Sequence, residues 1–281
     1  MKTGRGESKK KTGRKGSGSP SLPVITLLTD FGTADYFVGA VKGAILSVNP
    51  QAVIADITHE IPPQDVEAAA FTLLAAYPTF PPQTIHVAVV DPGVGSERRP
   101  IVVKAGSQFF VGPDNGIFTY IYDREPSHQT FHITSDKYFR PSPSTTFHGR
   151  DIFAPVAAAL STGVKPKKLG PEIRDEIRLN NSLKPEVLND GTIEGRIIHI
   201  DRFGNCITNL TRELVDPAKH PTLVVKRKTI DTFRDFYGSS DRNELFAIWG
   251  SAGFLEISIN GGSAAKVLIA KRGDRVLLKG E

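Results

Sequence analysis

Apolar and polar residues alternate along the first part of the chain with the periods of short strands and amphipathic helices. Three β-prone apolar runs predict strands at Val24–Leu28, Val53–Ile57 and Ile85–Val90. Apolar residues at helical spacing predict helices at Asp35–Val48 and Gln64–Tyr77. Because strands and helices alternate, we expect an α/β domain whose sheet is mostly parallel and is covered by helices.

Further elements are predicted before residue 170. Ile101–Lys104 and Gln108–Val111 have the composition of strands and lie close enough along the chain to form a hairpin. Asp151–Ser161 is predicted to be a helix that Asp151 caps and that ends near Gly163. These elements belong to the same α/β part of the chain.

The pattern changes after about residue 170, where short strands begin to recur between turn residues. They are predicted at Ile193–Ile200, Thr222–Lys228, Leu245–Trp249, Phe254–Ile259, Lys266–Ala270 and Arg275–Leu278. This spacing predicts a smaller all-β domain that resembles a barrel. We therefore divide the chain into a tail at 1–21, an α/β domain at 22–178 and a β-barrel-like domain at 179–281.

The composition is that of a globular protein, since 39% of the 281 residues are hydrophobic and 23% are charged. The net charge of +5 originates in the tail, where seven Lys or Arg residues face one Glu, so residues 22–281 carry about −1. We therefore expect no specific binding of nucleic acid by the folded part. The tail has almost no apolar residues, and we expect it to be disordered.

The expected location is the cytoplasm. No apolar run approaches the roughly 18 residues that a transmembrane helix needs, and the tail lacks the apolar segment of a signal peptide. We therefore expect no membrane partner. The single cysteine, Cys206, excludes an intramolecular disulfide and favours a reducing compartment. Cys206 lies among apolar residues and is expected to be a core residue.

Two predicted strands end in a carboxylate followed by a glycine-containing turn, at Asp30 and at Asp91. Ligands of open α/β sheets bind beyond the carboxyl ends of the strands, so each carboxylate could bind hydroxyl groups or orient a base. Each could equally be a turn or capping residue. The sequence contains no Walker A loop, no Gly-x-Gly-x-x-Gly after the first strand and no Gly-x-Ser-x-Gly elbow, so neither NAD binding nor an α/β-hydrolase is indicated.

Two other segments carry polar groups suited to a site. Thr146–Asp151 places His148 in a glycine-flanked loop before a predicted helix, where catalytic groups are common and structural histidines are common too. Asp201–Asn205 combines a carboxylate, the aromatic ring of Phe203 and the amide of Asn205. This set suits an amino group and a purine, although a turn closed by local side-chain bonds would use the same residues.

Six short motifs together resemble one family, the S-adenosyl-L-methionine (SAM) hydroxide adenosyltransferases, which are related to the SAM-dependent fluorinase and chlorinase. In chain order they are Thr29–Gly32 (TDFG), Asp91–Gly95 (DPGVG) with Arg98, Pro113–Gly116 (PDNG), Thr146–Asp151 (TFHGRD), Asp201–Asn205 (DRFGN) and Ser251–Ile257 (SAGFLEI). Each motif is short, but the ordered set spans about residues 23–280.

The resemblance implies an enzyme that converts SAM and water into adenosine and methionine, with SAM as substrate and no cofactor. It also implies a homotrimer whose ligand lies between the N-terminal domain of one subunit and the C-terminal domain of the next. The hydrolase branch of the family is marked by an Asp–Arg–His set, which Asp91, Arg98 and His148 match. Halogenases lack this set and have an arginine after the residue matching Ser251, where this chain has Ala252.

Substrate-binding residues are implied motif by motif. Asp30 matches a residue that holds the ribose hydroxyls, and Phe147 matches one that packs beside the ribose. Asp201 matches the position that binds the methionine ammonium, and Asn205, close to Phe203, matches one that contacts adenine. The remaining matches are Tyr237 beside the base, Ser251 near the methionine carboxylate, and the backbone of Asn260 and Gly261 along the adenine.

The chemistry of this reaction suits the Asp–Arg–His set. The leaving group is a neutral thioether, so no general acid is needed, and activation of water is the difficulty. We expect Arg98 to supply fixed positive charge beside the water, and His148 and Asp91 to orient the water and to accept or relay its proton. The sequence leaves open which of the three takes the proton.

Three alternatives are kept. A metal-dependent phosphoesterase would gather Asp30, Asp56, His59 and Asp91, which all follow predicted strands, around a cation. A non-catalytic module would bind adenosine or SAM with an idle site, and a halide transferase would replace water by a halide. Metal analysis, product analysis and an assay with and without chloride would separate these functions.

Overall fold

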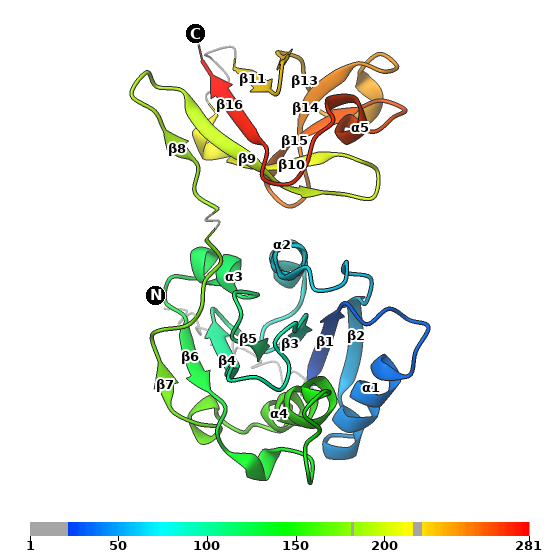
Figure 1. Ribbon diagram of the computed structural model, residues 1–281, viewed down its shortest axis with the longest axis vertical. Helices are drawn as coiled ribbons and strands as arrows, with labels where there is room; N and C mark the ends of the chain where they lie inside the picture. The colour runs from blue at the N-terminus through cyan, green and yellow to red at the C-terminus, as the bar shows by residue number, and fades with distance from the viewer. Residues whose placement is uncertain (1–21, 181–182, 216–220, 281) are drawn as a thin grey trace, which may run out of the picture.

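The computed structural model describes residues 22–180, 183–215 and 221–280, so the predicted disordered tail lies outside the described residues. The ribbon in Figure 1 shows two domains, with the first sheet in the lower one and the second sheet in the upper one. Within the described ranges, no helix combines the length and the apolar character needed to span a bilayer.

The first sheet is mixed and has seven strands among the described residues, in the order β2-β1-β3-β5-β4-β6-β7. They are β1 (Val24–Thr29), β2 (Val53–Thr58), β3 (Ile85–Val89), β4 (Pro100–Ala105), β5 (Gln108–Pro113), β6 (Gln129–His132) and β7 (Glu172–Ile173). Strand β1 pairs in parallel with β2 and β3, and β3 with β5. The pairs β5·β4, β4·β6 and β6·β7 are antiparallel, so the expected mostly parallel sheet is not confirmed.

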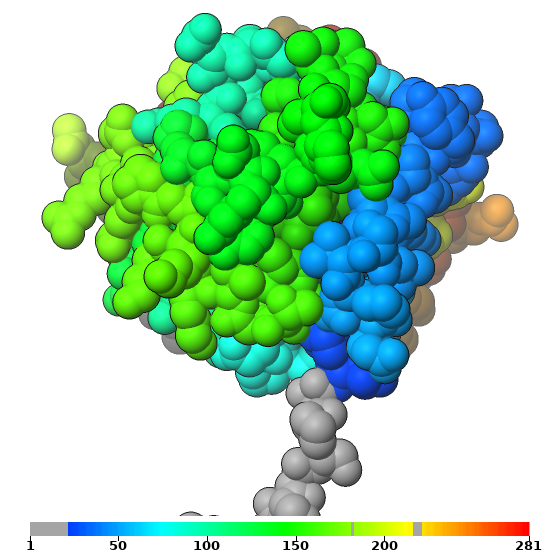
Figure 2. Space-filling model, turned by 90° about the horizontal axis from the view of Figure 1, so that it is seen from below, coloured from blue at the N-terminus to red at the C-terminus, as the bar shows by residue number. Residues whose placement is uncertain are grey.

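Helices cover both faces of this sheet. They are α1 (Phe37–Val48), α2 (Val66–Ala76), α3 (Thr119–Arg124) and α4 (Ala154–Ser161), with 3₁₀ turns at Tyr77–Thr79, Asp136–Tyr138 and Pro166–Lys168. Helices α1 and α4 pack together, and Asn49 donates to Ser161 Oγ at 2.8 Å where they end. Figure 2 views this side, with α1 in blue beside the green segments that include α4. Helices α2 and α3 lie toward the second domain (Figure 1).

The two domains share one apolar core. On the α2 side of the first sheet, Leu73, Phe110 and Tyr120 are fully buried. Ile198 and Phe254 of the second domain belong to the same cluster. Each fully buried side chain of this size contributes roughly 1.5–3 kcal/mol through the loss of contact with water. The apolar contact therefore fixes the position of the second domain over α2 and α3.

The second domain is a curled sheet of nine strands among the described residues, in the order β12-β11-β16-β9-β10-β15-β14-β13, with β8 paired to β9. They are β8 (Glu186–Val187), β9 (Ile193–Ile200), β10 (Cys206–Thr211), β11 (Thr222–Val225), β12 (Lys228–Ile230), β13 (Phe233–Arg234), β14 (Leu245–Trp249), β15 (Phe254–Ile259) and β16 (Arg275–Lys279). Strand β12, at one end, lies against β14, near the other end. The curled sheet thus forms a half-barrel (Figure 1).

Two predictions for this domain are wrong. The segment predicted as a strand at Lys266–Ala270 contains most of a short helix, α5 (Ala264–Leu268), because Ser263 Oγ accepts the backbone N–H of Lys266 and caps it. The segment predicted as one strand at Thr222–Lys228 is a hairpin, because the chain turns at Lys226 with a φ of 55°. Among the described residues, this domain also has 3₁₀ turns at Arg212–Leu214 and Tyr237–Ser239.

Candidate active site

Two carboxylates meet at one edge of the first sheet. Asp30 follows β1 and Asp91 follows β3, and these two strands are parallel neighbours. Their carboxyl ends therefore point to the same edge, as expected for a ligand site of an α/β sheet. Both residues line a cleft of about 340 Å³. The other lining residues are Phe31, Phe37, Gln64, Val89, Pro92, Val94, Thr146, Phe147, His148 and Gly149.

Arg98 connects the other two members of the predicted catalytic set. Its Nε lies 3.0 Å from Oδ1 and 2.9 Å from Oδ2 of Asp91, and its Nη2 lies 2.5 Å from Oδ2. The same Nη2 lies 2.7 Å from Nδ1 of His148. Asp91 lies 7 residues before Arg98 and His148 lies 50 residues after it, and the fold joins the three side chains by hydrogen bonds. The structure therefore groups the three residues as predicted.

The ion pair between Arg98 and Asp91 is buried. The side chains of Arg98 and Asp91 are 8% and 5% exposed. Each charge at such a site needs the other, because an unpaired buried charge is strongly destabilising. The guanidinium also lies over the ring of Phe153, 5.2 Å from its centroid. Its Nη1 is buried without a hydrogen-bond partner among the described residues, so the site offers a donor to an added oxygen or anion.

His148 stands directly before an irregular helical turn. Gly149–Phe153 forms a π-helical turn that leads into α4. Such turns are frequent at functional sites. The prediction that Asp151 caps a helix is wrong, since the Asp151 carboxylate accepts the backbone N–H of Ser144 and pairs with Arg150. Burial and, next, the charge of Arg98 lower the pKa of His148.

Asp30 is positioned by a residue that the sequence did not indicate. The backbone N–H of Gln64 donates to Asp30 Oδ2 at 2.8 Å. Gln64 has a φ of 66°, which a non-glycine residue adopts only when its surroundings hold it there. In the sequence, the preceding Pro62-Pro63 indicates only that a helix begins nearby. The contact between Gln64 and Asp30 depends on the tertiary fold. It leaves the second oxygen of Asp30 available to a ligand in the cleft.

Phe147 belongs to an aromatic cluster on the cleft wall. The centroid of its ring lies 5.9 Å from that of Phe31, 5.3 Å from that of Phe37 and 6.5 Å from that of Tyr36, and each pair of rings is edge to face. The guanidinium of Arg150 lies over the Phe147 ring at 5.0 Å. These contacts hold an apolar surface beside Asp30, which suits the packing of a ribose against the ring.

The predicted residues of the second domain do not line this cleft. Asp201 closes a local turn, since its Oδ1 accepts the N–H groups of Phe203 and Asn205 and its Oδ2 accepts Asn205 Nδ2. Phe203 is 76% exposed and Tyr237 is 47% exposed. Ser251 and Gly261 are exposed as well, whereas the amide of Asn260 donates to the backbone of Ser240. One chain therefore brings together only the first-domain part of the predicted site.

Glu256 is a buried acid in the second domain that sequence reasoning missed. Its Oε2 accepts the Tyr237 hydroxyl at 3.0 Å, and the residue is 7% exposed. Burial and then the Glu256 charge raise the pKa of Tyr237 to about 12. Burial also raises the pKa of Glu256, with Asp201 acting in the same direction. The one charged residue in the strand Phe254–Ile259, which is otherwise apolar apart from Ser258, was the available signal.

The residues of the metal-site alternative do not converge. Asp56 pairs with Lys42 at 2.6 Å and with His59 at 3.2 Å, and His59 Nδ1 bonds to Thr29 at 2.8 Å. Asp56 and His59 therefore form a local cluster at the end of β2 and do not line the cleft. In the part of the chain that is described, no group of three or more His, Cys, Asp or Glu side chains is placed to hold a metal ion.

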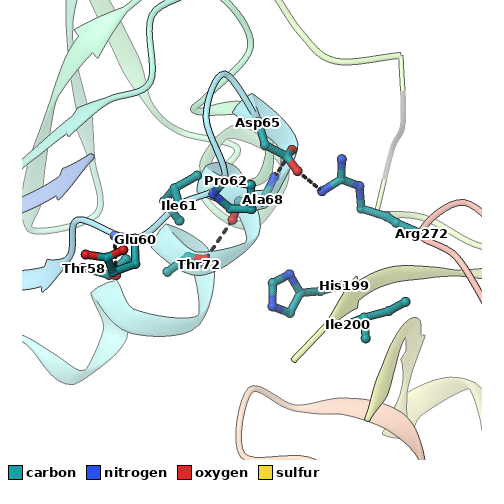
Figure 3. A pocket seen from close by; sticks show the side chains of 10 residues that line it. All are labelled: Thr58, Glu60, Ile61, Pro62, Asp65, Ala68, Thr72, His199, Ile200 and Arg272. Carbon is teal, nitrogen blue, oxygen red and sulfur yellow. Dashed lines mark hydrogen bonds and ion pairs between the residues drawn. The ribbon is translucent and has the colours of Figure 1, made fainter. Parts of the chain in front are cut away.

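A second cavity, of about 450 Å³, lies between the segment from β2 to α2 and the second domain (Figure 3). Arg272 of the second domain donates to Asp65 Oδ2 at 2.8 Å and lies 3.2 Å from Glu67. His199 stacks on Phe71 with 4.6 Å between ring centroids. The predicted site residues are all described, and none lines this cavity, which contains instead an ion pair between the domains.

The fold and the site define a two-domain protein with a buried Asp–Arg–His set at the carboxyl edge of a mixed sheet. Its sequence matches the SAM hydroxide adenosyltransferase N-terminal domain over residues 25–170 and the C-terminal domain of the same family over residues 195–277. The chain therefore belongs to the SAM hydroxide adenosyltransferase family, as its motifs predicted.

Individual relatives agree with this assignment. An (R)-S-adenosyl-L-methionine hydrolase of Methanocaldococcus jannaschii is 38% identical over 263 residues, covering 88% of this chain and 92% of that protein. A fluorinase of Nocardia brasiliensis is 26% identical over 293 residues, covering 92% and 97%. The crystal structure of a conserved protein from Thermotoga maritima superimposes with a TM-score of 0.83 at 39% identity, covering 90% of this chain and 99% of that one.

Proposed function

We propose that this protein hydrolyses SAM to adenosine and L-methionine by in-line attack of water on C5′. The observation that carries the proposal is the buried chain of bonds from Asp91 through Arg98 to His148 at the edge of the cleft. The relatives that are 35–38% identical over most of the chain are named as SAM hydrolases. Their names specify the (R) configuration, and we propose (R)-SAM as the preferred epimer.

The mechanism uses the fixed charge of the site. The Arg98 guanidinium places N–H donors and a fixed positive charge beside the attacking water, and a preorganised donor acts strongly in a buried site. Asp91 and His148 orient this water toward C5′. Attack converts a sulfonium into a neutral thioether, so the positive charge of the substrate disappears and no group has to protonate the leaving sulfur. Alignment of oxygen, carbon and sulfur lowers the barrier further.

The substrate would be held by both domains. In this proposal Asp30 binds the ribose hydroxyls and Phe147 packs beside the sugar. Asp201, through its turn, orients Asn205 toward adenine and faces the methionine ammonium. The second-domain residues, which include Phe203, Tyr237, Ser251, Asn260 and Gly261, come from a neighbouring subunit. We therefore propose a homotrimer with three composite sites, acting in the cytoplasm without a cofactor.

Halide transfer is the second candidate, because fluorinases are among the relatives, at 25–27% identity. The match of Asp91, Arg98 and His148 to the hydrolase branch and the higher identity to hydrolases favour water as the nucleophile. A chloride transferase would need chloride for turnover. A hydrolase would release adenosine equally well without it.

The function is tested by chromatography of the full chain incubated with (R)-SAM and, separately, with (S)-SAM. We expect adenosine and methionine from the (R) epimer, at a rate that EDTA does not change and chloride does not increase. A matched reaction with Arg98→Ala should release little adenosine. Absence of adenosine with both epimers would contradict the proposal, and loss of activity with EDTA would support a metal-dependent mechanism instead.

A further inference from the structure

The bond between Arg98 and His148 fixes which imidazole nitrogen carries a proton. Arg98 Nη2 lies 2.7 Å from His148 Nδ1. A guanidinium has N–H donors and no acceptor, and it is not deprotonated in proteins. Nδ1 must therefore accept this hydrogen bond. In the neutral ring the proton is consequently on Nε2.

The surroundings of His148 favour this neutral ring. Burial comes first and the positive charge of Arg98 second among the causes that lower the pKa of His148, while Asp91 and Asp151 act in the opposite direction. Protonation would also place an N–H on Nδ1 against the N–H of the guanidinium. The ring is therefore neutral at neutral pH. Its Nε2 carries the hydrogen and can donate, and the lone pair on Nδ1 accepts from Arg98.

We infer that His148 acts in the hydrolysis as a hydrogen-bond donor through Nε2, and that Asp91 accepts the proton of the attacking water. This inference rests on the proposed function and assigns the direction of proton transfer within it. A neutral imidazole whose Nδ1 accepts from Arg98 and whose Nε2 carries hydrogen has no free site for a further proton. Oδ1 of Asp91 accepts a hydrogen bond from Arg98 Nε at 3.0 Å. A carboxylate oxygen has two lone pairs, so Oδ1 can also accept the proton of the water.

The step balances without another reactant. A lone pair of the water oxygen forms the bond to C5′ while the C5′–S bond breaks and its electron pair passes to sulfur. The oxygen becomes strongly acidic once it is bonded to carbon, so a carboxylate is a sufficient base. One water proton passes to Asp91, and this proton reaches solvent when adenosine and methionine leave. Arg98 and His148 keep their protons throughout.

Two substitutions at His148 distinguish its two possible roles, hydrogen-bond donor and general base. His148→Gln keeps an amide N–H near the position of Nε2 and has no basic nitrogen. His148→Asn keeps an acceptor near the position of Nδ1, but its shorter side chain places no N–H at the position of Nε2. We expect kcat of His148→Gln to remain within about tenfold of wild type, and kcat of His148→Asn to fall about 10²–10³-fold, as for the loss of a preorganised donor. Asp91→Asn should fall about 10²–10⁴-fold, as for the loss of a general base.

His132→Gln is the matched control, because His132 lies on β6 outside the cleft, and it should leave kcat unchanged. Thermal melting of each variant verifies folding. A histidine base predicts the opposite pattern, in which His148→Gln falls at least 100-fold and loses an acid limb that the wild-type pH profile shows. That result would overturn the inference.

The tautomer has a readout that does not need turnover. ¹⁵N NMR of the substrate-free full chain should show His148 with hydrogen on Nε2 and none on Nδ1 at neutral pH. Hydrogen on Nδ1 would overturn the inference even if SAM is hydrolysed. If SAM is not hydrolysed, the proposed function fails, and the spectrum still reports separately on the donor assignment.

Discussion

Arg98 bonds to both other members of the proposed catalytic set, Asp91 and His148, so its shape should matter as much as its charge. A lysine would keep the charge, but one ammonium does not reproduce the planar contacts to Asp91 and His148. We expect Arg98→Lys to lower kcat about 10²–10³-fold while the Kd for SAM changes little, because in the proposed mechanism the guanidinium acts on the water. Steady-state kinetics and calorimetric titration measure the two effects. Turnover at the wild-type rate would remove Arg98 from the mechanism.

Asp30 should contribute to binding and not to water activation. A charged hydrogen bond to a hydroxyl is worth about 1.5–3 kcal/mol, so we expect Asp30→Ala to weaken adenosine binding roughly 10–100-fold. Asp35→Ala is the matched control, because Asp35 is exposed in the same loop and does not line the cleft. Calorimetric titration with adenosine provides the measurement. Equal affinities for the two variants would exclude Asp30 from the ribose site.

Sequence reasoning succeeded for residues whose position follows from a strand end. Asp30 and Asp91 were placed at the carboxyl ends of strands, and the fold brings them to one cleft. It failed for Asp151, whose cap-like position gave no indication of its bonds to Ser144 and Arg150. The role of the backbone of Gln64 depends on a contact with a distant loop, which no local pattern encodes.

At the scale of the element, short apolar segments were the least predictable. Lys266–Ala270 has apolar residues suited to a strand, yet the cap at Ser263 starts a helix there. Five residues are too few to distinguish a period of 2 from a period of 3.6. The longer segments predicted as helices, Asp35–Val48 and Gln64–Tyr77, contain the helices α1 (Phe37–Val48) and α2 (Val66–Ala76), because a pattern that extends over several turns identifies a helix.

Helix α2 offers a test of how an element positions the site. Arg272 holds Asp65 at the start of α2 (Figure 3), and the adjacent Gln64 holds Asp30. We expect Arg272→Ala to raise KM several-fold with little change in kcat, and Arg272→Lys to restore part of the loss. The ion pair is partly exposed, so stability should fall by no more than about 1 kcal/mol. A fall in kcat with unchanged KM would contradict this coupling.

At the scale of the molecule, one chain does not bring all the predicted site residues to the cleft. The cleft contains the first-domain residues, whereas Tyr237 and Phe203 are exposed on the second domain. The arrangement of two domains was predictable from the change in pattern near residue 170. The antiparallel half of the first sheet was not, because local patterns indicate strands and not the direction of their partners.

Mixed oligomers test the composite site. Co-expression of His148→Ala and Asn205→Ala chains would produce some trimers in which an intact first domain meets an intact second domain of its neighbour. With random assembly, about one quarter of the sites are intact, so activity should return to roughly that fraction of wild type. Each variant alone should remain inactive. Absence of recovery in a mixed trimer, verified by native mass spectrometry, would indicate that each chain forms its own site.

The central claim is that water, oriented by Asp91, Arg98 and His148, attacks C5′ of the nucleoside. The most direct measurement is mass spectrometry of the products formed from (R)-SAM in ¹⁸O-labelled water. We predict that adenosine gains one ¹⁸O at the 5′ hydroxyl and that methionine gains none. Unlabelled adenosine, or label in methionine alone, would contradict the account.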